Sequence, residues 1–322
     1  MIKTTEETAK MPDIALVTDA ESLPIDYDMP PILEIAEEIG LSVKVCEWDD
    51  PEVDWSSFET VLLRSPWTYA TRLAEFLAWC KRVSKVTRLS NPLDAVLWGL
   101  DKHYLGDLAR HGVPTVPTRF VEADADQPDV DLEAFMGDHP NAREFVVKPT
   151  IGAYSRNVKR FRRDRKDEAS DYLRSLIDAG SSVILQPYFE SIDALGETDL
   201  IYFNGTFSHA IRKGALLMPD GTVNVPTADF RKARDPDKVE KDVAEAALRA
   251  ASVHLGHDAP LFYARIDLIR DPLGAPVVLE MEISEPSLSL PFCEGSARRF
   301  VKAIAKEFGG VRAERERADA NA

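Results

Sequence analysis

Two acidic, strand-like segments near the C-terminus constrain this chain more than any other feature. Residues 263–270 and 276–287, with turn residues between them, read as two antiparallel strands that carry acidic residues at period-2 spacing among apolar ones. Asp267 lies on the first, and Glu280 and Glu282 lie two residues apart on the second, so these two glutamates share a face. Like charges opposite one another on strands repel, and hard cations bound jointly with phosphate oxygens are the usual reason to gather them. The pattern therefore favours metal–nucleotide chemistry over a solvated face with scattered acids.

Composition limits the class of protein and its partners. A chain of 322 residues with 44% hydrophobic content is long enough for two or three subdomains. Its net charge of -16 argues against a nucleic-acid partner, which needs a basic face. No apolar run approaches a membrane span, and the first residues lack the apolar core of a signal peptide. We therefore expect a cytoplasmic protein, monomer or homodimer, that acts on a small molecule.

Residues 13–89 alternate short apolar runs with amphipathic helical stretches, which is typical of a doubly wound α/β unit. Asn91-Pro92 marks the predicted end of this unit. Ligands in such sheets gather beyond the carboxyl ends of the strands. Arg64 and Ser65 follow one predicted strand and are therefore candidate substrate residues, unless their loop merely covers the core.

A predicted helix over residues 93–111 carries Lys102, and a strand ending in Lys148 leads into a loop of small residues that contains Ser155. The strand, the loop and the strand that follows predict a flap. Its backbone N–H groups can bind phosphate while Lys148 adds a point charge. The P-loop order of residues is missing. Taken alone the flap is a weak signal, because most lysines at strand ends are solvated.

Taken in order, these elements resemble the layout of the ATP-grasp superfamily. They are Lys102, the flap at Lys148, the bend from Gln186 to Glu190, Arg212-Lys213, the R-x-D of Arg265 and Asp267, and the E-x-E of Glu280 and Glu282. The strings L-L-R-S-P-W-T-Y, S-H-A-I-R-K and E-P-S-L-S-L are similar to the branch that contains the cycloserine-forming O-ureido-serine cyclo-ligases. The resemblance implies an α/β and α+β chain, an ATP-grasp fold preceded by a Rossmann-like doubly wound domain. The implied domains are an N-terminal domain over 1–92, a lid subdomain with a linking helix over 93–186, and a catalytic subdomain with a tail over 187–322.

The resemblance also implies which residues bind ATP. Lys102, Lys148 and the flap with Ser155 would contact the phosphates. Backbone groups near Gln186, Tyr188 and Phe189 would hold the adenine, with the Gln186 amide available to its edge. A carboxylate after the bend would bind the ribose. Glu197 is the first choice, with Asp193 or Glu190 as alternatives.

For the metal and the reacting groups, the resemblance implies the following roles. Asp267, Glu280 and Glu282 would bind two Mg²⁺ ions, with Glu280 bridging. Many family members have asparagine where this chain has Glu282, so the extra charge either strengthens binding of the second ion or favours Mn²⁺. The cations at the reacting phosphate and carboxylate would be Arg265 with Arg212 or Lys213. The substrate carboxylate would meet Ser287, Arg64 or Ser65. His209 would bind substrate or transfer a proton, although a histidine on a strand is more often structural.

The implied activity is ATP-dependent, ADP-forming ligation. The γ-phosphate passes to a substrate carboxylate, and an amine nitrogen attacks the acylphosphate. In the branch named above, this closes O-ureido-D-serine to D-cycloserine within one molecule. One alternative is an intermolecular peptide or amide ligase that joins two amino acids. Another is an inactive nucleotide-binding regulatory protein, which has no reason to retain three repelling carboxylates. A calcium-binding module would not explain the two lysines, and EF-hand spacing is missing.

Overall fold

The computed structural model describes residues 14–218, 220–224 and 230–308. The predicted C-terminal tail beyond residue 308 lies outside the described residues. The chain divides into two compact units: one contains the described residues up to Leu93 together with those from Ala297 onward, and the other runs from Asp94 to Ser296. The three-part division predicted from the sequence stays a prediction. Among the described residues, no helix is both long enough and apolar enough to cross a membrane.

The first unit is built on a parallel sheet of four strands in the order β2-β1-β3-β4. Every residue of β1 and β3 is buried, as expected for central strands covered on both faces. The predicted doubly wound α/β unit is therefore confirmed. Its elements are β1 (Ile14–Thr18), α1 (Met29–Ile39), β2 (Val43–Glu47), β3 (Thr60–Ser65), α2 (Leu73–Val83), β4 (Arg88–Ser90) and α9 (Ser296–Phe308).

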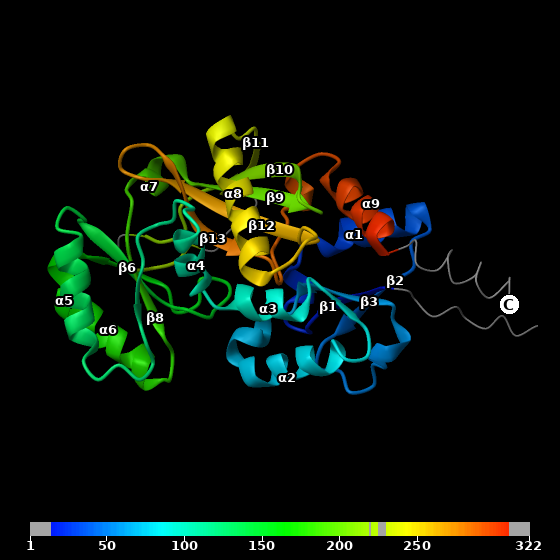
Figure 1. The fold of residues 1–322 in the computed structure, drawn as a ribbon, viewed down its shortest axis with the longest axis horizontal. Helices are drawn as coiled ribbons and strands as arrows, with labels where there is room; N and C mark the ends of the chain where they lie inside the picture. Colours follow the sequence, from blue (N-terminus) through cyan, green and yellow to red (C-terminus); the bar gives the residue numbers. More distant parts are fainter. Residues whose placement is uncertain (1–13, 219, 225–229, 309–322) are drawn as a thin grey trace, which may run out of the picture. The chain divides into compact units, whose positions relative to one another are not determined.

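Helix α9 comes last in the described chain but packs with this first unit, beside α1 in Figure 1. The Arg298 guanidinium donates to Glu38 on α1. Arg88 Nη2 donates to Glu307 Oε1 at 2.7 Å. The Arg64 guanidinium carbon lies 5.3 Å from the centre of the Phe300 ring. The end of the described chain is thus held by contacts with its beginning.

The second unit opens with α3 (Leu93–Leu100) and α4 (Tyr104–Arg110). The prediction of one continuous helix over 93–111 is wrong, because the chain turns at residues 101–103. There Asp101 Oδ1 accepts from the His103 backbone N–H at 3.1 Å, a local bond that competes with helix continuation. The backbone N–H of Lys102 instead donates to Thr150 O at 2.9 Å. This turn brings Lys102 to the flap.

An antiparallel sheet in the order β5-β8-β6-β7 carries the flap. Its apolar face packs against α5 and α6 through a cluster that includes Phe135, Phe145 and Leu173. The flap, residues 150–158, connects β6 to β7, and Tyr154, Ser155 and Asn157 in it have left-handed backbone angles. The elements are β5 (Arg119–Val121), α5 (Pro128–Asp138), β6 (Glu144–Pro149), β7 (Lys159–Arg162), α6 (Lys166–Asp178) and β8 (Val183–Pro187).

The second sheet of this unit has five strands in the order β11-β10-β9-β12-β13. Its elements are α7 (Ser191–Leu195), β9 (Glu197–Phe203), β10 (Thr206–Lys213), β11 (Arg231–Arg234), α8 (Lys238–Leu255), β12 (Tyr263–Arg270) and β13 (Pro276–Glu282). The predicted hairpin through Asn204-Gly205 is confirmed, with both residues at positive φ. Its register shifts between Phe207 and His209, so Ser208 forms a bulge.

Helix α8 packs on this sheet through a stripe of small residues, among them Ala244, Ala247 and Ala251. Its N-terminus is a capping box. Asp237 Oδ1 accepts from the Glu240 backbone N–H at 2.8 Å, and Glu240 Oε2 accepts from the Asp237 backbone N–H at 2.8 Å. Two backbone donors that the helix itself cannot satisfy are thereby paired.

We predict that Asp237→Ala lowers the free energy of unfolding by about 1 to 2 kcal/mol, the usual cost of losing an N-cap. Asp237→Asn keeps an oxygen that can accept the same bond and should stay within about 0.5 kcal/mol of the wild type. Urea denaturation followed by circular dichroism measures both. Equal destabilisation by the two substitutions would show that the ion pair of Asp237 with Arg270, not the cap, stabilises this end.

Candidate active site

The two acidic strands pair as predicted. In the register of β12 with β13, Arg265 lies opposite Glu282 and Asp267 lies opposite Glu280. Carboxylate oxygens of Asp267, Glu280 and Glu282 all lie within 4.8 Å of one another. Oxygen ligands at this spacing suit a hard cation, so the residues present fit Mg²⁺. The metal-binding role of these residues stays a prediction.

Arg265 lies between two of these carboxylates and binds both. Its Nε and Nη2 donate to the two oxygens of Asp267, both at 2.8 Å, and Nη2 also donates to Glu282 Oε1 at 2.6 Å. Its Nη1 donates to Ser287 O at 3.0 Å. Such a fork-to-carboxylate pair is rigid, so the guanidinium is fixed between the metal-binding candidates and the loop after β13.

The two lysines predicted to bind phosphate come to the same place. Lys148, at the end of β6, donates from Nζ to Glu280 Oε1 at 2.6 Å. Lys102 Nζ donates to Gly152 O in the flap at 3.3 Å. Burial disfavours the charged form of Glu280, but Lys148 and then Lys102 outweigh it and hold the pKa of this carboxyl well below its usual range. Glu280 is therefore ionised throughout the neutral range.

Sequence reasoning missed a second group of carboxylates on this face. Oxygens of Glu197, Asp199 and Asp267 also lie within 4.8 Å of one another. Lys213 Nζ lies among them, 2.7 Å from Glu197 Oε2, 3.7 Å from Asp199 Oδ2 and 3.8 Å from Asp267 Oδ2. Within the described residues, Asp199 Oδ1 has no hydrogen-bond partner. The period-2 spacing of Glu197 and Asp199 was the signal that could have identified Asp199.

Two carboxyl groups on this face bind protons unusually tightly. Burial, reinforced by the adjacent Asp267, raises the pKa of Asp199 to about 7. Loss of hydration likewise raises the pKa of Glu282 to about 8, even though Arg265 opposes the rise and the side chain is still 33% exposed. The pKa of Glu280 on the same face is lowered, so the site combines one carboxyl with a lowered pKa and two with raised pKa values.

Lys213 and Arg212, the alternative candidates for catalysis, lie on opposite faces of β10. Lys213 points to the carboxylates, whereas the Arg212 guanidinium donates to the carbonyl oxygens of Leu195 and Ala194 at the end of α7. The structure does not bring Arg212 to the acidic face. Gly196, at φ 72°, allows the backbone after α7 to approach the end of β10 closely, because a Cβ at this position would lie 2.3 Å from Lys213 O.

The predicted adenine residues line an apolar cluster. Tyr188 and Phe189 belong to it with Val116, Val146, Ile192, Ile269 and Val277, and Leu217 and Leu279 pack against it. Gln186 is buried beside them, opposite Val146 in the register of β8 with β6. Such a surface suits a flat base.

The three ribose candidates differ in what already binds them. Asp193 accepts from the Tyr188 hydroxyl at 2.6 Å and from two Arg160 nitrogens at 3.0 Å. Glu197 is paired with Lys213 on the acidic face. Glu190 is exposed and lies 3.6 Å from Arg143. Glu197 is thus the candidate nearest to the other polar groups of the site.

Of the substrate candidates, His209 contacts the loop after β13 that contains Ser287. Nε2 of His209 lies 2.8 Å from Leu288 O, and Nδ1 lies 2.9 Å from Ser208 Oγ. The His209 ring is buried and contacts the carbonyl oxygen of Leu288. The carbonyl oxygen of the preceding residue, Ser287, accepts from Arg265. The contact with Leu288 fits a structural role for His209.

Arg64 and Ser65 belong to the first unit, at the carboxyl end of β3. Both are fully buried. Arg64 Nη2 lies 3.6 Å from Asp28 Oδ2, and Ser65 Oγ lies 2.8 Å from Thr18 Oγ1. These contacts are within the first unit, and the role of both residues toward the substrate stays a prediction.

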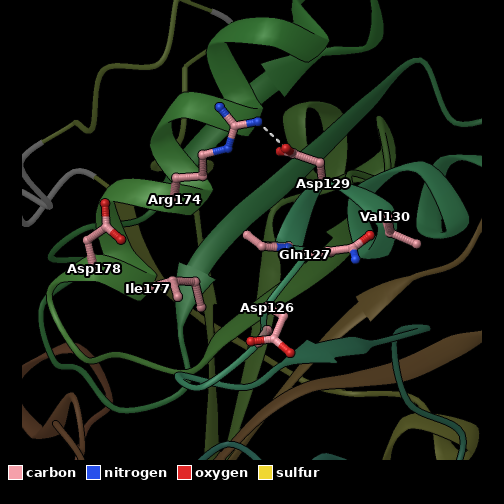
Figure 2. A pocket seen from close by; sticks show the side chains of 9 residues that line it. Asp126, Gln127, Asp129, Val130, Arg174, Ile177 and Asp178 are labelled. Atoms are coloured by element: carbon pink, nitrogen blue, oxygen red, sulfur yellow. Dashed lines mark hydrogen bonds and ion pairs between the residues drawn. The ribbon is translucent and has the colours of Figure 1, made fainter.

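A surface hollow in the flap-bearing part of the second unit contains none of the predicted site residues (Figure 2). It is lined by Ala125–Val130 and by Arg174, Ile177 and Asp178 of α6. Arg174 pairs with Asp129, which leaves the carboxylates of Asp126 and Asp178 as its other charges. This lining repels phosphate, so the hollow does not suit a nucleotide.

Comparisons with known proteins agree with this geometry. Residues 14–91 match a family model described as "D-cycloserine synthetase DcsG, N-terminal domain". The chain is 57% identical over 293 residues to the cycloserine biosynthesis protein DcsG of Streptomyces lavendulae, covering 91% of this chain and 98% of that protein.

Solved structures give the same answer for the fold. The crystal structure of D-cycloserine synthetase DcsG superposes with a TM-score of 0.88 at 56% identity, covering 92% of this chain and 99% of the other. D-alanine–D-alanine ligase of Bacillus anthracis follows with a TM-score of 0.65 at 15% identity, covering 94% and 99%, a likeness of fold alone. The ATP-grasp ligase PsnB gives 0.60 at 16%, covering 92% and 98%. By sequence identity over nearly its whole length, the chain belongs to the DcsG family of D-cycloserine synthetases, which has the ATP-grasp fold.

Proposed function

We propose that this chain is an ADP-forming ligase that uses ATP to close O-ureido-D-serine to D-cycloserine. The observation that carries the proposal is the convergence of Asp267, Glu280 and Glu282 with Lys148 and Arg265 on one face of a sheet, in a chain 57% identical to DcsG. Phosphoryl transfer between two anions is limited by electrostatic repulsion, and cations fixed in advance relieve it.

The reaction has two parts. The substrate carboxylate attacks the γ-phosphate, which gives an acylphosphate and ADP. The nitrogen bonded to the side-chain oxygen then attacks the acyl carbon, phosphate leaves, and a five-membered ring closes. Hydrolysis of the carbamoyl group on that nitrogen consumes one water and releases carbon dioxide and ammonia. Because nucleophile and acyl carbon belong to one molecule, proximity supplies much of the rate.

The residues divide the work as follows. Asp267, Glu280 and Glu282 would hold two Mg²⁺ ions, for which Mn²⁺ is an alternative, and these would neutralise phosphate oxygens. Lys102 and Lys148 would bind the phosphates. Arg265, fixed by Asp267 and Glu282, would stabilise the oxyanion at the acyl carbon. The flap would exclude water, which destroys acylphosphates. Dependence on ATP and Mg²⁺ fits a cytoplasmic enzyme.

The direct test is ADP release with ATP and Mg²⁺. O-ureido-D-serine is offered alone, and amino acids are offered singly and in pairs. We expect turnover with O-ureido-D-serine alone and a loss on the order of 10³-fold in Glu280→Gln, which keeps the shape but removes the charge. Turnover that needs a pair of amino acids would instead establish an intermolecular ligase. Nucleotide binding without turnover would point to a regulatory protein.

Neighbouring residues on β10 give a matched comparison. Lys213→Ala should lower kcat/KM by about 10²-fold, because it removes a cation from the acidic face. Arg212→Ala should change it by no more than about twofold, since this side chain binds carbonyl oxygens on the other face. Thermal unfolding of both variants controls for loss of folded protein. Comparable losses of activity in two folded variants would contradict this assignment.

Mg²⁺ binding should depend on pH in a defined direction. Asp199 and Glu282, with pKa values raised to about 7 and about 8, hold protons near neutrality, and a cation binds only the ionised carboxylate. The affinity for Mg²⁺ should therefore rise as the pH increases from 6 to about 8.5 and then level off. Calorimetric titration of the nucleotide-free enzyme measures this. Glu282→Gln should flatten the upper part of the profile, and an unchanged slope in that variant would rule Glu282 out as the titrating ligand.

A further inference from the structure

The donor and acceptor roles are fixed in the hydrogen bonds that join Gln186, Thr118 and Val116. Thr118, just before β5, donates from its hydroxyl to Val116 O at 2.8 Å. A carbonyl oxygen can only accept, so this bond uses the single proton of the hydroxyl. The Thr118 oxygen is also 2.9 Å from Gln186 Nε2, and in that bond the amide must therefore be the donor.

This chain of bonds fixes which way the Gln186 amide faces. The residue is buried, and among the described residues none donates to its Oε1. If the amide turned over, Oε1 would face Thr118, and the hydroxyl would have to leave the carbonyl of Val116, itself a buried residue, to donate to it. An abandoned buried acceptor is costly. The amide thus keeps its acceptor oxygen directed away from Thr118.

A backbone donor follows Gln186 by three residues, just after β8. The backbone N–H of Phe189 has no acceptor among the described residues. The apolar cluster with Val146 and Leu279 adjoins both groups. Adenine has an amino donor beside a ring-nitrogen acceptor, whereas guanine has a carbonyl acceptor beside a ring N–H donor. An acceptor at Gln186 and a donor at Phe189 match the hydrogen-bonding groups of adenine, and both would mismatch those of guanine.

We propose that Thr118 is a positioning residue that sets nucleotide specificity: by fixing the Gln186 amide, it makes the site select adenine over guanine nucleotides. The inference rests on the proposed function, because it takes the base to lie at Gln186. Thr118 acts through Gln186 and does not itself reach the base.

The test is the ratio of ADP to GDP affinity, measured calorimetrically with Mg²⁺ in the wild type, Thr118→Ser and Thr118→Val. We expect the wild type to bind ADP at least about tenfold more tightly than GDP, the effect of one mismatched buried hydrogen bond. Thr118→Ser keeps the hydroxyl and should keep this ratio. Thr118→Val has nearly the same shape but neither donates nor accepts, so the amide is free to turn and the ratio should fall toward one.

The ratio compares two ligands on one protein sample, so partial unfolding of a variant cancels. A wild-type ratio retained in Thr118→Val, an equal loss in Thr118→Ser, or a wild type without preference would each overturn the proposal. Binding requires no amino-acid substrate. Wild-type enzyme that prefers ADP but never turns over O-ureido-D-serine would therefore refute the proposed ring closure and leave the role of Thr118 standing.

Discussion

The organisation of the second unit depends on the electrostatic attraction between buried acids and buried bases on one face of the five-stranded sheet. Five carboxylates converge there from three adjacent strands, namely Glu197, Asp199, Asp267, Glu280 and Glu282. Three cations pair with them, which are Lys148, Lys213 and Arg265. Charges buried without partners would be prohibitively costly, so strand register, the flap strand and the hairpin bulge must all be correct at once for this face to exist.

The charges on this face are unequal in number, and the inequality has a chemical consequence. With every group ionised, the five carboxylates exceed the three cations paired with them by two negative charges, and Lys102, which also lowers the pKa of Glu280, offsets part of this excess. Two of the carboxyls, Asp199 and Glu282, have raised pKa values, so protons bound there reduce the negative charge further. Divalent cations arriving with ATP would replace those protons. In the proposed function, these carboxyls would thus carry protons in the free enzyme and metal ions in its complex with ATP.

Sequence patterns predicted the residues that spacing within one strand identifies, and missed those whose role depends on how neighbouring strands pair. Asp267, Glu280 and Glu282 follow from period-2 spacing within single strands, and the ATP-grasp fold was implied by the resemblance of these motifs, in their order, to that superfamily. The choice between Arg212 and Lys213 does not. A plain two-residue turn at Asn204-Gly205 would place Arg212 opposite Glu197, but the bulge at Ser208 shifts the register by one and places Lys213 there. A bulge has no reliable sequence signal, so the dipeptide alone left both residues open.

One further difference has the same origin. Asp199 was missed because its importance comes from Asp267 on the neighbouring strand, which lies opposite it in the register of β9 with β12. Arg64 and Ser65 were proposed as substrate residues because they follow a strand end; both side chains are fully buried, and their role toward the substrate stays a prediction. Position along a strand predicts where a residue lies in the sheet, whereas its side-chain partners depend on tertiary packing.

Strand periodicity also relates the base-binding cluster to the acidic face. Val146 and Lys148 lie two residues apart on β6, on the same face, and Val146 belongs to the apolar cluster while Lys148 binds Glu280. Gln186 lies opposite Val146 in the neighbouring strand β8. The distance between alternate residues of a strand is about 7 Å, which is comparable to the separation of a base from the phosphates of a bound nucleotide. In the function proposed above, one short strand would therefore set both the direction and the spacing of bound ATP, with its base toward Gln186 and its phosphates toward the carboxylates.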